Sequence, residues 1–160
     1  MNKTSPTTLK AILCPVDFSP SSEKALLHVA ERHACDAELV VLHVGKGDSG
    51  ERGKLMKEQL HHFSRYSDML SAYRCEVRFA IEYGSPAETI IEYAKNRGTE
   101  LIVLGSHGMN NISRLLVGST TETVMRHAPC QVLVLKSPRP VDDGEVCAKN
   151  SIATLSKTNA

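Results

Sequence analysis

The chain has 160 residues, of which 41% are hydrophobic and 23% charged, and this size and composition fit one globular domain around a single core. Its 19 Lys and Arg against 18 Asp and Glu leave a formal net charge of +1, which excludes the large positive excess that draws proteins to nucleic acid or to anionic membranes. The longest apolar runs are far shorter than the roughly 18 to 20 residues of a membrane span.

The first half of the chain predicts two strands and two helices in alternation. An apolar run at 11–14 predicts a strand, and Ser19 and Pro20 predict the start of the following helix, as its N-cap and its first helical residue. A second apolar run at 39–42 predicts another strand. After a polar loop, a helix that begins near Glu51 is expected to turn one face to the core, formed by Met56, Leu60, Phe63 and Leu70.

The alternation of apolar and polar residues over 75–81 predicts a strand at an edge of the sheet, because strands covered on both faces are apolar throughout. The next helix is expected to begin at Pro86, behind a capping box of Ser85 and Glu88, and to end at Gly98. Its expected core-facing residues are Ala87, Ile90, Ile91 and Ala94.

Two further apolar runs, 101–104 and 132–135, predict strands on either side of a last helix. The residues of that helix at helical spacing are Thr121, Val124, Met125 and Ala128. Strands that alternate with helices imply right-handed crossovers, which generate a parallel sheet with helices on both faces. We therefore expect an α/β fold of the Rossmann or flavodoxin kind, with an open sheet of five parallel strands in the order 3-2-1-4-5.

The composition divides the chain into three segments. Residues 1–8 are expected to be an N-terminal extension and residues 9–136 the domain. Residues 137–160 are rich in Ser, Thr, Lys and Asn, so we expect a flexible C-terminal tail. One weak helical turn is the alternative for part of that tail, formed by Ile152, Ala153 and Leu155.

The five cysteines form an odd set without any C-x-x-C pair, which favours neither a disulfide framework nor a zinc site. Cys14, Cys75 and Cys130 lie in or beside apolar runs, where a free cysteine is usually a small core residue. The polar start of the chain has no signal-peptide core. We therefore expect a cytoplasmic protein with reduced thiols.

The most informative motif is a glycine-rich loop between the fourth strand and the last helix. Gly105-Ser106-His107-Gly108 closes the run at 101–104, nine residues follow, and Gly118-Ser119-Thr120-Thr121 opens the helix. Glycine lets the backbone approach a ligand, and a helix start supplies unpaired N–H groups and a partial positive charge. The loop is therefore expected to hold phosphate. Asp17 follows the first strand and would lie beside this loop, where the winding of the sheet reverses.

Four segments together resemble the universal stress protein family over about residues 9–136. They are Pro15-Val16-Asp17-Phe18-Ser19, Leu42-His43-Val44, the glycine-rich loop and 128–134. The loop carries the pattern G-x2-G-x9-G-[ST] without a gap, which marks the ATP-binding branch of that family. The resemblance implies an adenine nucleotide alpha hydrolase-like fold and one ATP in each subunit. It also implies a homodimer through the last strand, with tetramers as a further possibility.

The resemblance also implies roles for individual residues. Asp17 would accept hydrogen bonds from the ribose, Val44 would meet the adenine edge through its backbone, and Pro15 would line the base pocket. Gly105 would lie near the ribose, and the rest of the loop would hold the phosphates. The candidate nucleotide-binding residues are Pro15, Asp17, Val44, Gly105, Ser106, His107, Gly108, Met109, Asn110, Asn111, Gly118, Ser119, Thr120 and Thr121.

Two positions bear on the charge of the phosphates. Met109 stands where a basic residue is common in the family, and Arg114 is the only cation within the nine-residue insert. Charge compensation then falls to Arg114 or to a divalent ion that bridges the phosphates, so we expect Mg²⁺ or Mn²⁺ with ATP. No residue of the chain is assigned as a metal ligand.

The leading hypothesis is an ATP-binding stress-response protein, a nucleotide-dependent regulator or chaperone-like partner binder that hydrolyses ATP slowly at most. The sequence has no G-x-x-x-x-G-K-[ST] motif and no assigned base beside the loop, so no catalytic residue is expected. The alternative is an ATPase or an adenylyl-transferring enzyme of related fold. A third hypothesis is a nucleotide-free module that dimerises through a sheet edge. For Asp17, a structural role at the helix start is the alternative to ribose binding.

Overall fold

The computed structural model describes residues 9–33, 37–46, 52–106, 117–136 and 153–155. The elements are, in chain order, β1 (Ala11–Val16), α1 (Pro20–His33), β2 (Glu38–Gly45), α2 (Arg52–Leu70), β3 (Glu76–Tyr83), α3 (Pro86–Arg97), β4 (Leu101–Gly105), α4 (Ser119–His127), β5 (Gln131–Leu135) and β6 (Ala153–Leu155). Every strand and helix expected within 9–136 is therefore present.

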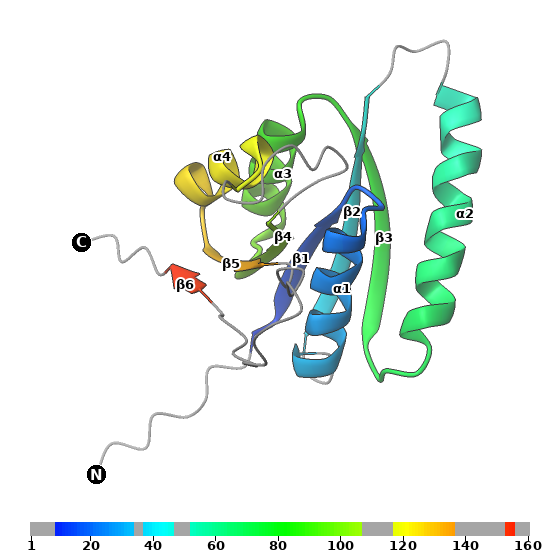
Figure 1. Cartoon of the computed structure of the whole chain (residues 1–160), viewed down its shortest axis with the longest axis horizontal. Coiled ribbons are helices and arrows are strands. Elements are labelled where there is room, and N and C mark those ends of the chain that lie inside the picture. Colours follow the sequence, from blue (N-terminus) through cyan, green and yellow to red (C-terminus); the bar gives the residue numbers. More distant parts are fainter. Residues whose placement is uncertain (1–8, 34–36, 47–51, 107–116, 137–152, 156–160) are drawn as a thin grey trace, which may run out of the picture.

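The strands form one sheet in the order β3-β2-β1-β4-β5-β6, which can be followed in Figure 1. Strands β1 to β5 run parallel, so the α/β class and the order 3-2-1-4-5 are confirmed. Strand β3 lies at an edge, as its alternating pattern predicted. Strands β1 and β4 are neighbours although α1, β2, α2, β3 and α3 separate them in the chain. The winding of the sheet reverses at this pair.

Strand β6 belongs to the segment expected to be a flexible tail. It pairs antiparallel with β5, with Leu133 opposite Thr154, so the helical turn considered for Ile152, Ala153 and Leu155 is wrong. The open edge of β5 offers a row of backbone N–H and C=O groups, and pairing with such an edge requires little of the side chains. Composition therefore did not predict this strand. The remainder of 137–160, and residues 1–8, lie outside the described residues.

Two hydrophobic clusters hold the helices on the two faces of the sheet. Along β1, Ile12, Cys14 and Val16 join the cluster with α1 and α2, whereas Leu13 joins the cluster with α3 and α4. Figure 1 shows these helix pairs on opposite faces. Successive side chains of a strand point to opposite faces, so an unbroken apolar run fills both clusters. Cys14 is fully buried, as expected, and burial raises the pKa of its thiol to about 12.

The helix starts agree with the sequence in position, but only one has the expected cap. At α1 the Ser22 N–H donates to Oγ of Ser19 over 3.2 Å, which confirms Ser19 as the N-cap. Helix α3 begins at Pro86 and ends at Gly98, which has a left-handed φ of 62° that glycine adopts readily. Ser85 makes no side-chain cap bond there, so the expected capping box is not formed on its side.

The buried face of α2 differs from the expected one. Met56 is 46% exposed and Leu60 is 55% exposed, so these two do not face the core. The buried positions are Gln59, Phe63, Tyr66 and Leu70, a stripe with helical spacing that is rotated from the expected one. Gln59 takes the inward position because it packs at Gly45, beside the ring of Tyr83. A polar residue in the core face broke the hydrophobic pattern on which the expectation was built.

Helix α1 lies unusually close to the end of β4. A Cβ added to Gly105 would lie 2.8 Å from the backbone C and O atoms of Ser21, closer than real Cβ contacts. The glycine at this position therefore lets α1 pack against β4. This packing requirement is separate from any approach of a ligand to the loop.

We expect Gly105→Ala to lower the free energy of unfolding by about 1–3 kcal/mol, because the added methyl group meets main-chain atoms that move only with α1. Urea denaturation measures this. Gly53→Ala is the matched control, since a Cβ at Gly53 meets nothing within 4 Å. The control should be neutral or slightly stabilising, because alanine favours a helix over glycine. Equal stability of the two variants would contradict the packing role.

Candidate functional site

A cleft of about 510 Å³ opens where β1, β2 and β4 end, at the reversal of the winding. Its volume is in the range of small-molecule sites, roughly 300–1,000 Å³. Eight of the residues predicted from the sequence line it: Pro15, Asp17, Val44, Gly105, Gly118, Ser119, Thr120 and Thr121. The sheet topology thus brings together residues from both halves of the chain.

One part of the cleft wall is apolar. Leu42 and Val44 come from β2, Leu104 from β4, and Ile90 from the inner face of α3. Pro15 at the end of β1 adds its ring. Such a wall can receive a flat, weakly polar group such as a purine base, and the backbone of a strand end can hydrogen-bond to the edge of that base.

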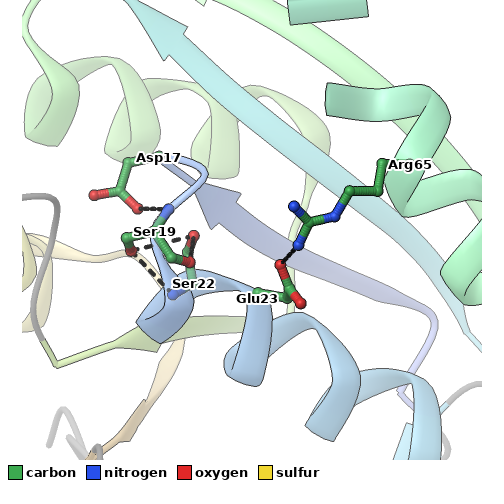
Figure 2. Close-up of polar contacts among 5 residues, drawn as sticks. All are labelled: Asp17, Ser19, Ser22, Glu23 and Arg65. Carbon is green, nitrogen blue, oxygen red and sulfur yellow. Dashed lines mark hydrogen bonds and ion pairs between the residues drawn. The ribbon is translucent and has the colours of Figure 1, made fainter. Parts of the chain in front are cut away.

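Asp17 has a structural contact and also faces the cleft. Its Oδ1 accepts a hydrogen bond from the Ser19 N–H over 3.1 Å, at the start of α1, as Figure 2 shows. In the same view the other carboxylate oxygen points away from this turn. A carboxylate offers about four acceptor positions, so a carboxylate that accepts a backbone N–H can also accept from the hydroxyls of a ligand. The two roles considered for Asp17 are therefore compatible.

The start of α4 supplies hydrogen-bond donors to the cleft. The first N–H groups of a helix have no acceptor within it, and no side chain of the described residues caps α4. Those groups belong to Ser119, Thr120 and Thr121, all of which line the cleft. The helix dipole adds a partial positive charge there. This end of the cleft can therefore hold an anion.

Gly118 is the N-cap of α4, with φ −61° and ψ 151°. Any residue adopts this conformation, so the backbone itself does not require glycine here. What glycine contributes is the absence of a side chain at the cleft wall. The Gly118 N–H donates to the Ser106 carbonyl over 2.9 Å, which brings the two ends of the loop together.

The hydroxyl of Thr121 is already engaged within the protein. It donates to the carbonyl of Gly105 over 3.0 Å, and Thr121 is buried. This bond fastens the first turn of α4 to the end of β4. Thr121 therefore offers the cleft its backbone N–H, because its hydroxyl is engaged with Gly105.

Of the remaining predicted residues, the structure describes Ser106 alone. Ser106 is 1% exposed and does not line the cleft, and its N–H donates to the Leu135 carbonyl. The others of the set lie outside the described residues, as does Arg114: His107, Gly108, Met109, Asn110 and Asn111.

The structure adds cleft residues that the sequence did not single out. Lys46 follows β2 directly and brings a cation to the wall, and Pro86 and Ile90 come from the start of α3. The signal for Lys46 was available, because residues just beyond the carboxyl end of a central parallel strand face the ligand side of such a sheet. Nothing in the sequence indicated that α3 reaches the same cleft.

His43 lines the cleft and is also fastened to the neighbouring strand. Its Nδ1 lies 2.8 Å from the Val16 carbonyl oxygen, and a carbonyl only accepts, so Nδ1 carries the proton. Burial lowers the pKa of His43, while the bond to Val16 and the nearby Asp17 carboxylate act to raise it. His43 is half-buried near the end of β2.

Within the described ranges, no helix combines the length and the apolar character that a bilayer crossing requires. Nor does that part of the chain gather three His, Cys, Asp or Glu side chains into a group that could hold a metal ion.

The fold and the cleft define a class: an open parallel α/β protein with a ligand cleft where the winding of its sheet reverses. Residues 8–136 match the Universal stress protein family. The chain belongs to the universal stress protein family.

Individual relatives agree in sequence and in fold. Universal stress protein MJ0577 of Methanocaldococcus jannaschii is 31% identical over 153 residues, covering 79% of this chain and 94% of the relative. The solved structure of MJ0577 matches with a TM-score of 0.75 over 83% of this chain and 99% of that one. Universal stress protein UspA from Lactobacillus plantarum matches with a TM-score of 0.67 and 32% identity, over 79% and 97% of the two chains.

We expect the free energy of unfolding to fall as the pH drops below about 6.5, the ordinary pKa of histidine. Because burial lowers the pKa of His43 in the folded chain, the unfolded chain binds the proton first, and acid favours unfolding. His28 acts in the same direction. Urea denaturation at several pH values between 7.5 and 5 gives the free energy of unfolding as a function of pH. This free energy should change less with pH in His43→Asn than in the wild type, with His61→Asn as control. If the free energy of unfolding of His43→Asn depends on pH as strongly as that of the wild type, the contribution of His43 is contradicted.

Proposed function

We propose that this chain binds ATP in the cleft and acts in stress responses as a nucleotide-dependent regulator or chaperone-like partner binder. The observation that carries the proposal is the composition of the cleft wall. An apolar surface, an acceptor-only carboxylate and a helix start that no described side chain caps line one cavity. A base, a ribose and a phosphate chain require these three kinds of surface.

An adenine nucleotide would use three parts of the described cleft wall. The base would lie against Leu42 and Ile90, with the backbone of Val44 at its edge. Asp17 would accept hydrogen bonds from the ribose hydroxyls. The phosphates would receive the N–H groups at the start of α4.

Lys46 is a further cation that could compensate the negative charge of the phosphates. The sequence left compensation to Arg114 or to a divalent ion, whereas the structure puts an exposed lysine on the cleft wall. A flexible lysine can approach a phosphate as a point charge. We propose that Lys46 shares this task with Mg²⁺ or Mn²⁺ bound to the phosphate oxygens.

Two solved structures of the same fold hold adenine nucleotides. One is a universal stress protein in complex with cAMP, with a TM-score of 0.63 and 20% identity, over 81% of this chain and 98% of that one. The other is a family protein from Arabidopsis thaliana with AMP bound, with a TM-score of 0.58 and 19% identity, over 84% and 94%. At this identity the likeness carries the fold alone, so the proposal for this chain rests on its own cleft.

The cleft favours binding over turnover. Asp17 is the only carboxylate among the described lining residues, and one of its oxygens already holds the Ser19 N–H. Hydrolysis requires a group that orients or activates water beside the terminal phosphate, and metal ions are usually held by further carboxylates. We therefore propose slow hydrolysis at most. A turnover near one per second, a low enzyme rate, would favour an ATPase or an adenylyl-transferring enzyme instead.

We expect Gly118→Val to weaken ATP binding by about tenfold or more, that is by at least about 1.4 kcal/mol, because a branched side chain would fill the approach to the amides of α4. Isothermal titration calorimetry with ATP and Mg²⁺ measures this. The fold should persist, since valine adopts the backbone angles found here.

Gly53→Val is the matched control, because it places the same side chain on α2 in open space. It should bind ATP like the wild type. Equal affinities of both variants would contradict the phosphate site, and a wild-type chain that does not bind ATP would contradict the proposed function.

We also propose that the chain forms a homodimer through the edge of β5, and that β6 competes with the second copy for this edge. The family resemblance places the contact at the last parallel strand, yet the open edge of β5 is paired here with β6 of the same chain. A second copy can pair with β5 only where β6 has left it, because each edge accepts one partner strand.

Thr154→Pro should therefore raise the dimer fraction at a given concentration, because proline restricts the backbone and disfavours a strand of only three residues. Sedimentation velocity over a range of concentrations measures it, with Thr158→Pro outside β6 as control. A wild-type dimer that Thr154→Pro leaves unchanged would contradict the competition, and monomers in all three chains would contradict the dimer.

A further inference from the structure

Phe18 has a positive φ of 63°, the only such residue other than glycine in the described part of the chain. A bulky residue in the left-handed region is strained, and the conformation persists only where its surroundings hold it. Phe18 lies between Asp17 and Ser19, the two residues joined by the hydrogen bond that orients the Asp17 carboxylate. The strained residue is therefore part of the turn that sets the position of the proposed ribose acceptor.

The ring of Phe18 is held between two histidines. It stacks on His43 with a centroid distance of 4.4 Å and an interplanar angle of 28°, and on His62 at 4.3 Å and 16°. Phe63 and Tyr66 contact it at centroid distances of 5.7 Å and 5.9 Å. Aromatic pairs at such separations attract one another beyond the burial of their area. These four rings supply the surroundings that the strained backbone needs.

The two stacking partners come from different parts of the fold. His43 is on β2, lines the cleft and is fixed by its bond to the Val16 carbonyl. His62 is on α2, which contributes no described residue to the cleft wall. The ion pair of Arg65 with Glu23, drawn in Figure 2, joins α2 to α1 just beyond the same turn. Helix α2 therefore contacts the turn around Asp17, although none of its described residues lines the cleft.

We propose that Phe18 and His62 are positioning residues for Asp17, so that the docking of α2 and the binding of a ribose are thermodynamically coupled. This inference rests on the proposed function, because it takes Asp17 as the ribose acceptor. Without the ring of His62, the Asp17 turn relaxes from the left-handed conformation and the carboxylate leaves its productive position. Coupling is reciprocal, so a bound nucleotide stabilises the docked position of α2 by the same factor.

The test compares ATP with 2′,3′-dideoxy-ATP, which keeps the base and the phosphates but lacks both ribose hydroxyls. His62→Ala should weaken ATP binding by about fivefold or more, the scale set by the strain of one such residue. The same variant should leave the affinity for dideoxy-ATP unchanged, because Asp17 does not contact that ligand. Isothermal titration calorimetry with Mg²⁺ measures both. A variant that merely disturbed the fold would weaken both ligands equally.

Matched variants separate the ring contact from other effects of the substitution. His61→Ala is the control, since His61 is the exposed neighbour on α2 and makes no ring contact with Phe18 among those found. His62→Phe should retain ATP affinity, because it keeps an aromatic ring against Phe18. Phe18→Gly should lose less ATP affinity than His62→Ala, because glycine adopts positive φ readily and the turn then needs no ring contacts to hold it.

A double-mutant cycle tests whether His62 affects ATP binding through Asp17. Asp17→Ala should weaken ATP binding, and adding His62→Ala to it should cause no further loss, because both changes remove the same interaction. In hydrogen exchange, ATP should slow the amides of α2 in the wild type and not in Asp17→Ala.

A wild-type chain that fails to bind ATP would overturn the proposed function, and this inference with it. A wild-type chain that binds ATP while His62→Ala loses both ligands equally, or neither, would overturn the positioning role alone. Additive losses of ATP affinity from Asp17→Ala and His62→Ala would also overturn the positioning role.

Discussion

The parallel pairing of β1 with β4 is the constraint on which the rest of the structure depends. Chain segments that are far apart in sequence meet there, and the helices that follow the two strands leave toward opposite faces of the sheet. Because the backbone diverges at this point, the ends of β1 and β4 cannot be covered by either connection, and a cleft remains. Asp17 and the start of α4 line the same cleft for this topological reason.

Close packing around that pair serves two purposes at once. Gly105 lets α1 lie against β4, and the Thr121 hydroxyl ties α4 to the same glycine's carbonyl. Helices α1 and α4, which both border the cleft, are thus anchored on one residue. A motif glycine that is usually explained by a ligand is explained here by helix packing as well, and the donors at the start of α4 are fixed before any ligand arrives.

Most of the fold and half of the candidate site could be read from local patterns. Apolar runs, the Ser19 cap and the αL glycine at 98 are short-range signals, and each lies where it was expected. The rotated face of α2 was not predictable, because Gln59 faces inward only where Gly45 and Tyr83 leave room for it. Strand β6 was missed for a related reason: its partner is an open backbone edge rather than a side-chain pattern.

The sequence by itself determined the class of fold, the position of the glycine-rich loop and the membership of the universal stress protein family, because these depend on periodicity and on residue spacing. Only the tertiary structure decided which groups face the cleft. Lys46 and Ile90 joined it through the sheet order, the Thr121 hydroxyl turned to Gly105, and Phe18 came to lie between His43 and His62. Contacts between distant segments follow from packing in three dimensions, which no local pattern of residues encodes.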